Sequence, residues 1–383
     1  MYFLIFSIKS IKYVPKLLPI ANSHTVVDYP MVSIILPCRN EEKYIEKCLD
    51  SLLAQDYPNY EIIAIDDSSS DRTAEIITRY SLMHNKIIYV DAQAKPEGWT
   101  GKNWACYKGY IRANGNLFLF TDADSIHCTS AIYLAINYLL FHKLDSLTVI
   151  PKITAHDYWT KITLPLLWTF SVARFSALRA NNSKTKEGGF FFGSFFVITK
   201  NVYESVGTHS SVRGEIIEDA ELGKKVKEQG FSLRVIRGEK YINAIWARDP
   251  YSLYHGLKRL LIPFYKKEKT KALVMGIATF VLLLLPLIIL PFSITIIKEE
   301  NRGEDMAKGL IISFLIIISI SLIIISSSLQ LEYILFENVV YSLAFPLAGS
   351  FILLAFISSI IHSKQKDNIN WRDRSYSINN KQL

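Results

Sequence analysis

Two aspartates separated by one residue, Asp122 and Asp124, directly follow the run Leu117–Thr121. Side chains two positions apart at the end of a strand point the same way, so both carboxylates can face one ion or the water bound to it. Oxygen ligands suit Mg²⁺ or Mn²⁺, and such ions are commonly shared with the phosphates of a substrate. An Asp-x-Asp pair alone is a weak signal, because it also occurs in turns. In this position, Asp122 and Asp124 are predicted to bind Mg²⁺ or Mn²⁺.

A second acidic segment begins with Asp66 and Asp67 and ends at Asp71. It can be a polar turn in which Asp71 caps the next helix, and a carboxylate in it can also hydrogen-bond a ribose or a base; the two roles are compatible. The chain has no GxGxxG motif, which weakens the hypothesis of a dinucleotide cofactor. It also has no P-loop, because the segment Gly98–Lys102 has the wrong spacing.

A third pair, Glu218 and Asp219, begins a predicted helix. One explanation is structural, because negative charge interacts favourably with the dipole at a helix N-terminus. The other is catalytic: an oxygen nucleophile that attacks an electrophilic carbon must lose its proton, and a positioned carboxylate can accept it. The sequence alone leaves open whether Asp219 points toward the metal.

An alternation of strands and helices positions these acids. Strands are predicted at Val32–Leu36, Glu61–Ile65, Ile87–Val90 and Leu117–Thr121, with helices between them. This alternation predicts an α/β fold with a mostly parallel, Rossmann-like sheet. In such sheets ligands bind beyond the carboxyl ends of the strands. Polar clusters follow three of the four strands at that edge: Arg39 with Glu41, Asp66 with Asp67, and Asp122 with Asp124.

Farther along the chain, Phe190–Val197 is predicted to form a buried strand and Asp219–Gln229 a short helix. A helix is also expected to start at Asn40, which can cap it. The apolar, aromatic stretch Ile162–Leu178 is expected to be an interfacial or core helix rather than a spanning one.

Three long runs without a charged residue fill most of residues 272–361: Ala272–Ile297, Gly309–Ser328 and Val339–Ile361. An apolar run of about 18 or more residues predicts a helix that spans a membrane. We therefore expect about three transmembrane helices after the α/β domain. The prolines Pro286, Pro291 and Pro346 are places where a run can break, so the number of crossings stays open.

The formal net charge of +8 is concentrated beside this region, because basic residues crowd the segment 251–271 just before the first run. Such residues usually mark the cytoplasmic side of a membrane and attract anionic head groups, so nucleic acid is not the expected partner. We expect an integral protein of the cell membrane with a cytoplasmic catalytic domain. The tail 362–383 is also basic. Three crossings would place this tail outside the cell, against the rule that basic segments stay on the cytoplasmic side. Residues 1–30 are expected to be an anchor or a leader.

In their order along the chain, these segments resemble family 2 glycosyltransferases of the GT-A fold. The matching segments are Val32–Glu42, Asp66–Thr73, Gly98–Lys102, Thr121–Asp124 and Glu218–Gly223. Each one is weak alone, but the ordered set is specific. The Gly-Trp-x-Gly-Lys element and the tail segment Trp371–Tyr376 are similar to a subgroup that contains hopanoid-associated, carotenoid and ceramide glycosyltransferases.

The resemblance implies a GT-A domain at residues 31–250 that transfers a sugar, with inversion, from a nucleotide-sugar donor. A UDP-sugar is the favoured donor, and the adjoining membrane helices favour a lipid acceptor. By position, Asp67 would hold the nucleoside, and Asp219, beside Glu218, would be the general base. The residues predicted to bind the donor are Pro37, Arg39, Glu41, Asp66, Asp67, Lys102, Asp122 and Arg259.

One motif of the family is missing. Members commonly carry Gln-x-x-Arg-Trp before the membrane, whereas this chain has only His255–Arg259, in which Arg259 stands in the place of that arginine. This departure argues against a processive synthase of the cellulose or hyaluronan type.

Two other functions remain open. One is a polyprenyl-phosphate sugar synthase, whose phosphate acceptor needs less help from a base. The other is a non-catalytic membrane protein that binds nucleotide sugars, or a transporter. The intact acids argue against a binding protein, and three apolar runs without an intramembrane charge would make a poor transporter.

Overall fold

The computed structural model describes residues 2–20, 29–299, 303–365, 368–371 and 374–377. The chain divides into two units, which are described separately. The sheet unit comprises Lys12–Thr154 and Phe175–Ile245, and the helical unit comprises Met1–Ile11, Ala155–Arg174 and Trp246–Leu383.

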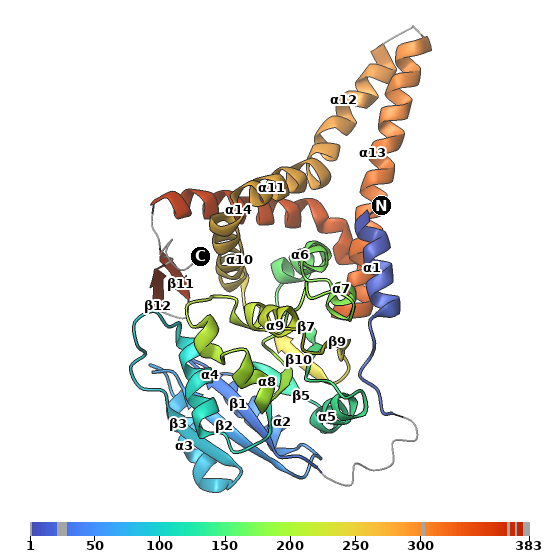
Figure 1. The fold of residues 1–383 in the computed structure, drawn as a ribbon. Coiled ribbons are helices and arrows are strands. Elements are labelled where there is room, and N and C mark those ends of the chain that lie inside the picture. Colours follow the sequence, from blue (N-terminus) through green and yellow to red (C-terminus); the bar gives the residue numbers. More distant parts are fainter. Residues whose placement is uncertain (1, 21–28, 300–302, 366–367, 372–373, 378–383) are drawn as a thin grey trace. The chain divides into compact units, whose positions relative to one another are not determined.

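A seven-stranded sheet with the order β3-β2-β1-β4-β8-β6-β9 forms the centre of the sheet unit (Figure 1). Only β8 runs antiparallel to its neighbours β4 and β6; the other pairs are parallel. The predicted mostly parallel α/β sheet is therefore confirmed. The strands are β1 (Val32–Cys38), β2 (Tyr60–Asp66), β3 (Ile87–Asp91), β4 (Leu117–Phe120), β6 (Ser146–Ile150), β8 (Phe196–Thr199) and β9 (Leu233–Arg237).

Helices cover both faces of this sheet, which is why its central strands are apolar on both sides. Ile34 of β1 belongs to a core shared with the helices on one face, whereas Ile35 contacts the helix on the other face at Gly109. The helices that share the core of Ile34 are α2 (Ile45–Leu53), α3 (Thr73–Met83) and α5 (Ala131–Phe141), and the opposite helix is α4 (Gly101–Arg112).

A small second sheet, not predicted from the sequence, holds the segment after Asp124. It has the order β5-β10-β7 and comprises β5 (Ser125–His127), β7 (Lys152–Thr154) and β10 (Ile242–Ile245). Because β5 starts directly after the acidic pair, its antiparallel pairing with β10 fixes that end of the loop. The remaining helices of this unit are α7 (Ala177–Ala180), α8 (Lys200–Ser205), η1 (His209–Val212) and α9 (Glu218–Glu228).

Two expected boundaries were wrong, for local reasons. No helix starts at Asn40: this residue has a left-handed φ of 52°, its side chain accepts a hydrogen bond from Ser70 N, and α2 begins only at Ile45. The predicted strand Phe190–Val197 is a loop as far as Phe195: Phe192 N donates to the side chain of Thr148 in β6 and not to a backbone oxygen of that strand.

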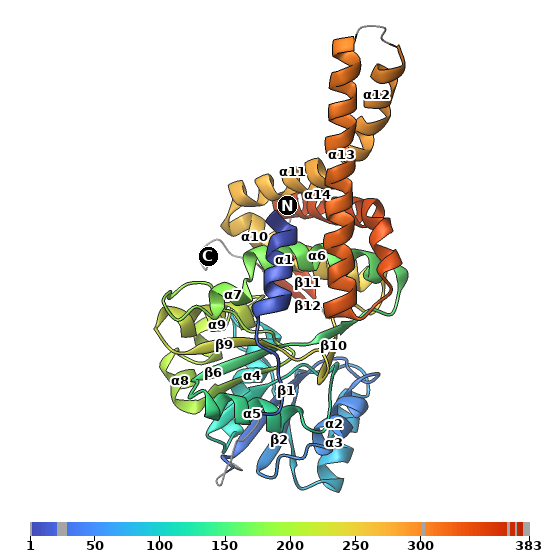
Figure 2. The same cartoon turned by 90° about the vertical axis from the view of Figure 1, so that its right-hand side faces the viewer.

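Long helices dominate the helical unit (Figure 2). They are α1 (Tyr2–Tyr13), α6 (Tyr158–Arg174), α10 (Pro250–Lys267), α11 (Lys269–Leu283), α12 (Leu285–Glu299), α13 (Gly303–Gln330) and α14 (Phe345–Gln365). Three stretches of the described residues are long and apolar enough to cross a membrane, namely Lys269–Ser293, Ala307–Leu335 and Val339–Ile361.

Two of these three stretches are interrupted where proline occurs. The first changes direction between α11 and α12, at Leu284, two residues before Pro286. The third starts as the 3₁₀ helix η3 (Val339–Ala344) and becomes α-helical one residue before Pro346. Proline at the start of a helix is well tolerated because its missing N–H would have no intrahelical partner there.

The helix α6 belongs to this unit, although it lies within residues 31–250 of the sequence. Its residues Ile162 and Leu166 pack in one apolar cluster with Leu283 and with Phe345 and Ile352 of α14. An ion pair of 3.2 Å between Lys161 Nζ and Glu337 Oε2 adds a polar contact at the start of the helix.

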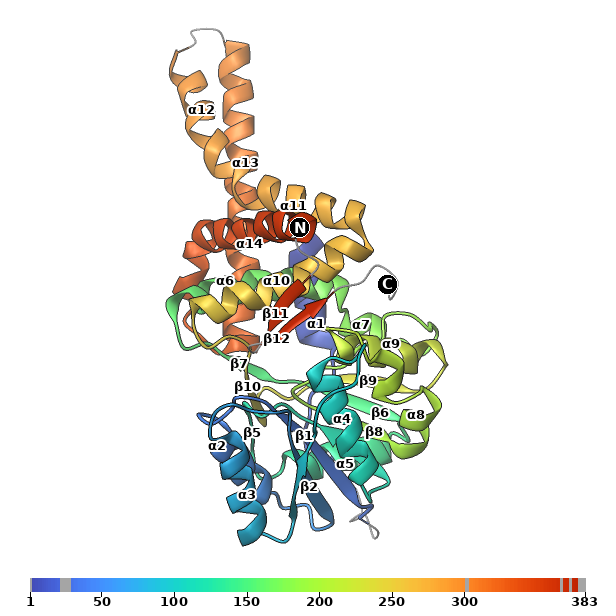
Figure 3. The same cartoon turned by 90° about the vertical axis from the view of Figure 1, so that its left-hand side faces the viewer.

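Near the C-terminus, β11 (Asn368–Trp371) and β12 (Arg374–Ser377) form an antiparallel hairpin (Figure 3). Several parts of the expected basic tail and N-terminal anchor lie outside the described residues: 21–28, Lys366, Arg372 and Lys381.

The buried Glu61 provides a test of the sheet. Its carboxylate accepts hydrogen bonds from Ser33 Oγ (2.6 Å), Asn114 N (2.7 Å) and Asn114 Nδ2 (3.0 Å) near the start of β1. Glu61→Ala leaves these donors buried without an acceptor and should lower the free energy of unfolding by about 3 kcal/mol. Chemical denaturation of the full-length protein measures this loss. A decrease in the free energy of unfolding of less than about 1 kcal/mol would contradict the prediction.

Candidate active site

The loops after β1 and β2 form one hydrogen-bonded assembly. Arg39 Nη1 donates to the backbone oxygens of Asp67 (2.6 Å) and Ser68 (2.7 Å), and Asn40 N donates to Ser69 Oγ (3.1 Å). Asp66 and Asp67 are only 5% and 3% exposed. The predicted donor residue Arg39 therefore holds the loop that carries these two acids.

Two other predicted donor residues lie in the framework beneath this loop. Pro37 is part of β1 and is paired in register with Ile65. Glu41 is 2% exposed; its backbone N donates to Thr73 Oγ1 (2.7 Å) and its carbonyl accepts from Ile45 N (2.9 Å). Their predicted contact with a donor stays a prediction.

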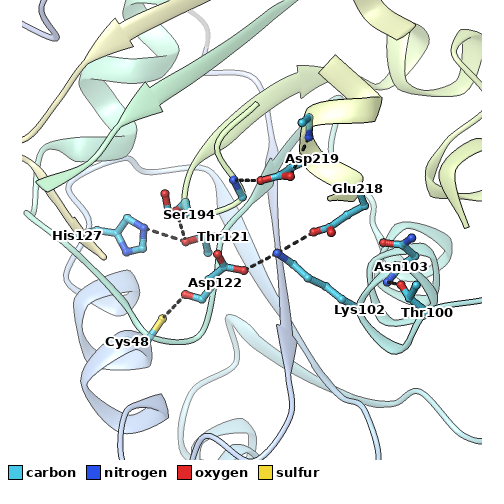
Figure 4. A network of polar contacts seen from close by, with 12 residues as sticks. Cys48, Thr100, Lys102, Asn103, Thr121, Asp122, His127, Ser194, Glu218 and Asp219 are labelled. Carbon is cyan, nitrogen blue, oxygen red and sulfur yellow. Dashed lines mark hydrogen bonds and ion pairs between the residues drawn. The ribbon is translucent and has the colours of Figure 1, made fainter. Parts of the chain in front are cut away.

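The ammonium group of Lys102 joins two of the acidic segments (Figure 4). Its Nζ lies 2.7 Å from Asp122 Oδ1 and 2.8 Å from Glu218 Oε1. The side chain of Glu218 is 7% exposed, that of Lys102 19% and that of Asp122 33%. The segment after β4 and the start of α9, far apart in sequence, are thus brought together by one cation.

Asp219 is oriented by backbone donors. Its Oδ2 accepts from Gly193 N (2.7 Å) and its Oδ1 from Ala220 N (2.8 Å) (Figure 4). Gly193 lies at the meeting point of the site: a Cβ atom there would be 3.0 Å from Asp219 Oδ2, 3.0 Å from Lys102 Nζ and 3.4 Å from Asp122 Oδ2. The structure therefore brings Asp122, Lys102 and Asp219 around one point.

The loop that carries Gly193 approaches α9 very closely. A Cβ atom on Gly189 would lie 2.4 Å from Gly223 O, and one on Gly223 would lie 2.4 Å from the carbonyl carbon of Phe190. The loop and the helix can pack at this distance because both residues are glycines, which have no Cβ atom. This contact holds the start of α9, and with it Asp219, next to the loop.

Thr121 connects the same loop to the end of β4. Its Oγ1 donates to Ser194 O (2.8 Å) and lies 3.1 Å from His127 Nε2, so the hydrogen of that contact comes from the imidazole. Burial lowers the pKa of His127 to about 4, which keeps the ring neutral. His127 is therefore a structural donor that fixes the segment before Asp122.

The proximity of the charges shifts two pKa values. Burial acts to lower the pKa of Lys102, but the carboxylates of Asp122, Glu218 and Asp219 outweigh it and hold this pKa well above its usual value. Burial, followed by repulsion from Glu218, raises the pKa of Asp219 to about 6, although Lys102 opposes this rise. At neutral pH the site thus holds a fixed cation and a carboxylate that is ready to accept a proton.

The residues at the end of β4 suit a shared metal ion rather than a self-sufficient metal site. Asp122 and Asp124 offer oxygen ligands on a partly exposed loop. Among the described residues, no group of three potential ligand side chains is placed to hold an ion by itself. Mg²⁺ typically binds through one or two carboxylates plus substrate phosphates, so the residues fit an ion that arrives with a diphosphate.

One predicted donor residue lies outside the sheet unit. Arg259 belongs to α10 of the helical unit, and its part in donor binding stays a prediction.

Comparison with known proteins gives the class and then the family. A mannosyltransferase from Pyrobaculum calidifontis, solved in complex with GDP-Man and Mn²⁺, superimposes with a TM-score of 0.53 at 14% identity and 94% coverage of both chains. The fold, with acids at the carboxyl edge of its sheet, is that of a GT-A glycosyltransferase. Residues 33–207 match the model of Glycosyl transferase family 2, so the chain carries a family 2 glycosyltransferase domain.

Two similar proteins are 4,4′-diaponeurosporenoate glycosyltransferases. That of Staphylococcus haemolyticus is 30% identical over 219 residues, which are 55% of this chain and 56% of the relative. That of Staphylococcus aureus strain RF122 is 26% identical over 365 residues, 93% of this chain and 90% of the relative. The match to the first relative thus spans little more than half of its length. The expected family and enzyme class are confirmed.

Gly193 was missed by the sequence analysis, because the strand predicted over it offered no reason to expect a functional loop. The signal that was available is the pattern Phe190–Ser194, in which a glycine and a serine interrupt an aromatic run. Such an interruption favours a turn or a close approach of backbones over a regular strand.

Substitution of Gly193 tests the meeting point. Gly193→Ala would place a methyl group 3.0 Å from both Asp219 Oδ2 and Lys102 Nζ, so these groups must shift. The shift needed is a few tenths of an ångström. Since a misplacement of about 1 Å at a reacting centre costs on the order of 100-fold in rate, sugar transfer by the purified variant should fall by roughly three- to tenfold, with an unchanged unfolding temperature. As a control, Gly256→Ala in α10 meets only ordinary contacts, the nearest 3.5 Å away; equal activity of the two variants would contradict the prediction.

Proposed function

We propose that the protein is a membrane-bound inverting glycosyltransferase that moves a sugar from a nucleotide-sugar donor, with UDP-sugars favoured, to a lipid acceptor. The observation that carries the proposal is the position of Asp219 Oδ2, Lys102 Nζ and Asp122 Oδ2 around one point at Gly193. A candidate base, a cation and a candidate metal ligand are the groups that this reaction needs within reach of one carbon atom.

The nucleoside would bind at the loop of Asp66 and Asp67. Asp66 Oδ2 accepts from Ser69 N (3.2 Å), whereas its buried Oδ1 accepts no hydrogen bond from the described residues. A buried carboxylate oxygen is costly without a donor, so a hydroxyl or N–H group of the nucleoside would satisfy it. Because Arg39 already fixes this loop, little conformational entropy would be lost on binding.

The diphosphate would lie between Lys102 and the pair Asp122 and Asp124. A divalent ion bound there, Mg²⁺ or Mn²⁺, would stabilise the negative charge that develops on the leaving diphosphate. The mannosyltransferase of similar fold, which was solved in complex with GDP-Man and Mn²⁺, supports this choice of ion. Lys102 contributes a positive charge of its own, which its carboxylate partners keep protonated.

Asp219 would act as the general base. Its Oδ2 faces the meeting point, and its raised pKa brings it close to neutral, where a carboxylate accepts a proton most effectively. The acceptor oxygen would attack the anomeric carbon on the side opposite the diphosphate, and the bond to the diphosphate would break. A hydroxyl acceptor would pass its proton to Asp219, whereas an ionised carboxylate has no proton to pass. One such displacement inverts the anomeric carbon.

The acceptor is proposed from the helices and the relatives. In the part of the chain that the structure describes, three stretches are long and apolar enough to cross a membrane, and the basic segment 251–271 before them favours a cytoplasmic catalytic domain. Both relatives are named for 4,4′-diaponeurosporenoate, and this ending denotes a carboxylate. We therefore propose an apolar lipid that carries a carboxylate or hydroxyl group at one end.

The experiment uses full-length protein, labelled UDP- and GDP-sugars, and 4,4′-diaponeurosporenoate or the corresponding alcohol as acceptor. A carboxylate is already ionised at neutral pH, whereas an alcohol must lose its proton during attack. Asp219→Asn should therefore slow transfer to the alcohol by about 100- to 10,000-fold and transfer to the carboxylate much less. Mass spectrometry of the lipid extract measures both products.

Calorimetry with UDP and Mn²⁺ serves as the control, because Asp219→Asn should still bind the nucleotide. Near-normal transfer to the alcohol by this variant would refute the base role. A product from native lipid that releases its sugar in mild acid would instead indicate a polyprenyl-phosphate acceptor.

The pH dependence tests the same residue. Asp219 is an effective base only when ionised, and its pKa of about 6 means that it becomes protonated as the pH falls through that value. The ratio kcat/KM with the alcohol acceptor should therefore be flat above pH 7 and fall about tenfold per pH unit below pH 6. Glu61→Ala, which leaves the site intact, should give the same profile; an acidic limb near pH 4 would contradict the assignment.

A further inference from the structure

The helix that carries Lys102 has a second connection to the start of α9. The residue after Lys102, Asn103, is fully buried, and its Nδ2 donates to three backbone oxygens: Val212 O (2.7 Å), Arg213 O (3.0 Å) and Glu215 O (3.1 Å). These residues lie in the segment 212–215, three positions before Glu218. Figure 4 shows Asn103 on the same helix as Lys102.

The neighbouring Thr100 supports this contact. Its backbone N donates to Arg213 O (2.8 Å), and its Oγ1 caps α4 by accepting from Asn103 N (3.3 Å). The segment 212–215 is therefore held by the first turn of α4. The backbone N of Thr100 and the side-chain Nδ2 of Asn103 thus both donate to the carbonyl oxygen of Arg213.

The chemistry of the amide shows that Asn103 serves as a donor. An NH₂ group has two hydrogens, and here they are shared among three carbonyl oxygens. Its Oδ1 accepts no hydrogen bond from the described residues, which is costly for a buried amide. If this side chain only filled space, an apolar residue of similar size would make the folded protein more stable, because it would bury no unpaired oxygen.

This clamp acts on a segment that joins two helices, since it starts at the last residue of η1 and ends three positions before α9. The backbone just before η1 has left-handed φ values at Gly207 (87°) and Thr208 (57°), and α9 begins at Glu218 without a side-chain cap. The direction in which Glu218 and Asp219 leave the segment therefore depends on where residues 212–215 are anchored. Lys102 holds Glu218 by its charge, and Asn103 holds the backbone that leads to it.

We propose that Asn103 is a positioning residue for Glu218 and Asp219, which acts through the segment 212–215 and makes no contact with substrate. This inference rests on the proposed base role of Asp219. It adds to the Gly-Trp-x-Gly-Lys element a residue that aligns the base, next to the lysine that faces the diphosphate site.

The experiment compares Asn103→Ala with Asn181→Ala in the full-length protein. Asn181 is a matched control, because its side chain also holds backbone, donating to Val235 O (2.8 Å) and accepting from Val235 N (2.7 Å). Turnover is measured with 4,4′-diaponeurosporenoate, its alcohol and the donor that the native protein uses. With the alcohol, Asn103→Ala should lower kcat about 100-fold with the donor KM within about threefold, and with the carboxylate it should lower kcat much less. Asn181→Ala should keep kcat within about twofold with both acceptors.

Hydrogen exchange gives a second readout that needs no ligand. Asn103→Ala should speed exchange of the amides at 212–221 by about tenfold or more, and Asn181→Ala should do so only at 233–237. Asn103→Ser, which keeps one donor, should be intermediate in both readouts and also serves if the alanine variant does not fold.

Two results would overturn the inference: equal kcat in Asn103→Ala and Asn181→Ala, or unchanged exchange at 212–221. The variant Asp219→Asn separates this failure from that of the proposed function. If Asp219→Asn is inactive with the alcohol while Asn103→Ala is normal, only the positioning role fails. If Asp219→Asn is fully active, the base role fails and the inference fails with it.

Discussion

The candidate active site depends on one positive charge, that of Lys102, among several carboxylates. Asp122, Glu218 and Asp219 all interact with Lys102, and the side chain of Glu218 is almost fully buried. Two like charges about 4 Å apart at the edge of a protein repel each other by several kcal/mol, so such a group of carboxylates does not assemble without a counter-charge. The ammonium group supplies it, and its two short ion pairs determine which segments meet.

The scaffold brings these groups together by ordinary means. Parallel strands end at one edge of the sheet, which places the loops after β1, β2 and β4 side by side. The acids of α9 come from a distant part of the sequence, and three contacts hold them at this edge: the packing of the loop 189–195 against Gly223, the ion pair of Lys102 with Glu218, and the hydrogen bonds of Asn103. The nucleotide side of the site thus consists of loops that directly follow parallel strands, whereas the proposed base side consists of a loop and a helix start that other contacts bring to this edge.

This division explains what could be predicted from the sequence. The strand runs before Arg39, Asp66 and Asp122 are apolar and bounded by turn residues, so both the sheet and the edge could be predicted. The loop around Gly193 and the clamp of Asn103 could not, because no strand pattern in the sequence brings Gly193 next to Asp219 or Asn103 next to Glu215. The ion pairs of Lys102 could not be predicted either. The sequence around Lys102 indicated a phosphate site, whereas in the structure its ammonium group is paired with carboxylates.

The path of the chain through α6 has a practical consequence. The polypeptide leaves the sheet unit after β7, contributes Ile162 and Leu166 to a cluster with Leu283, Phe345 and Ile352, and returns before α7. A fragment cut at residue 250 would keep α6 but lose those packing partners, and its bare apolar stripe would favour self-association in water. The catalytic part is therefore not separable as a soluble piece at the boundary that its sequence suggests, and detergent would be needed even for a protein shortened to the sheet and its inserted helix.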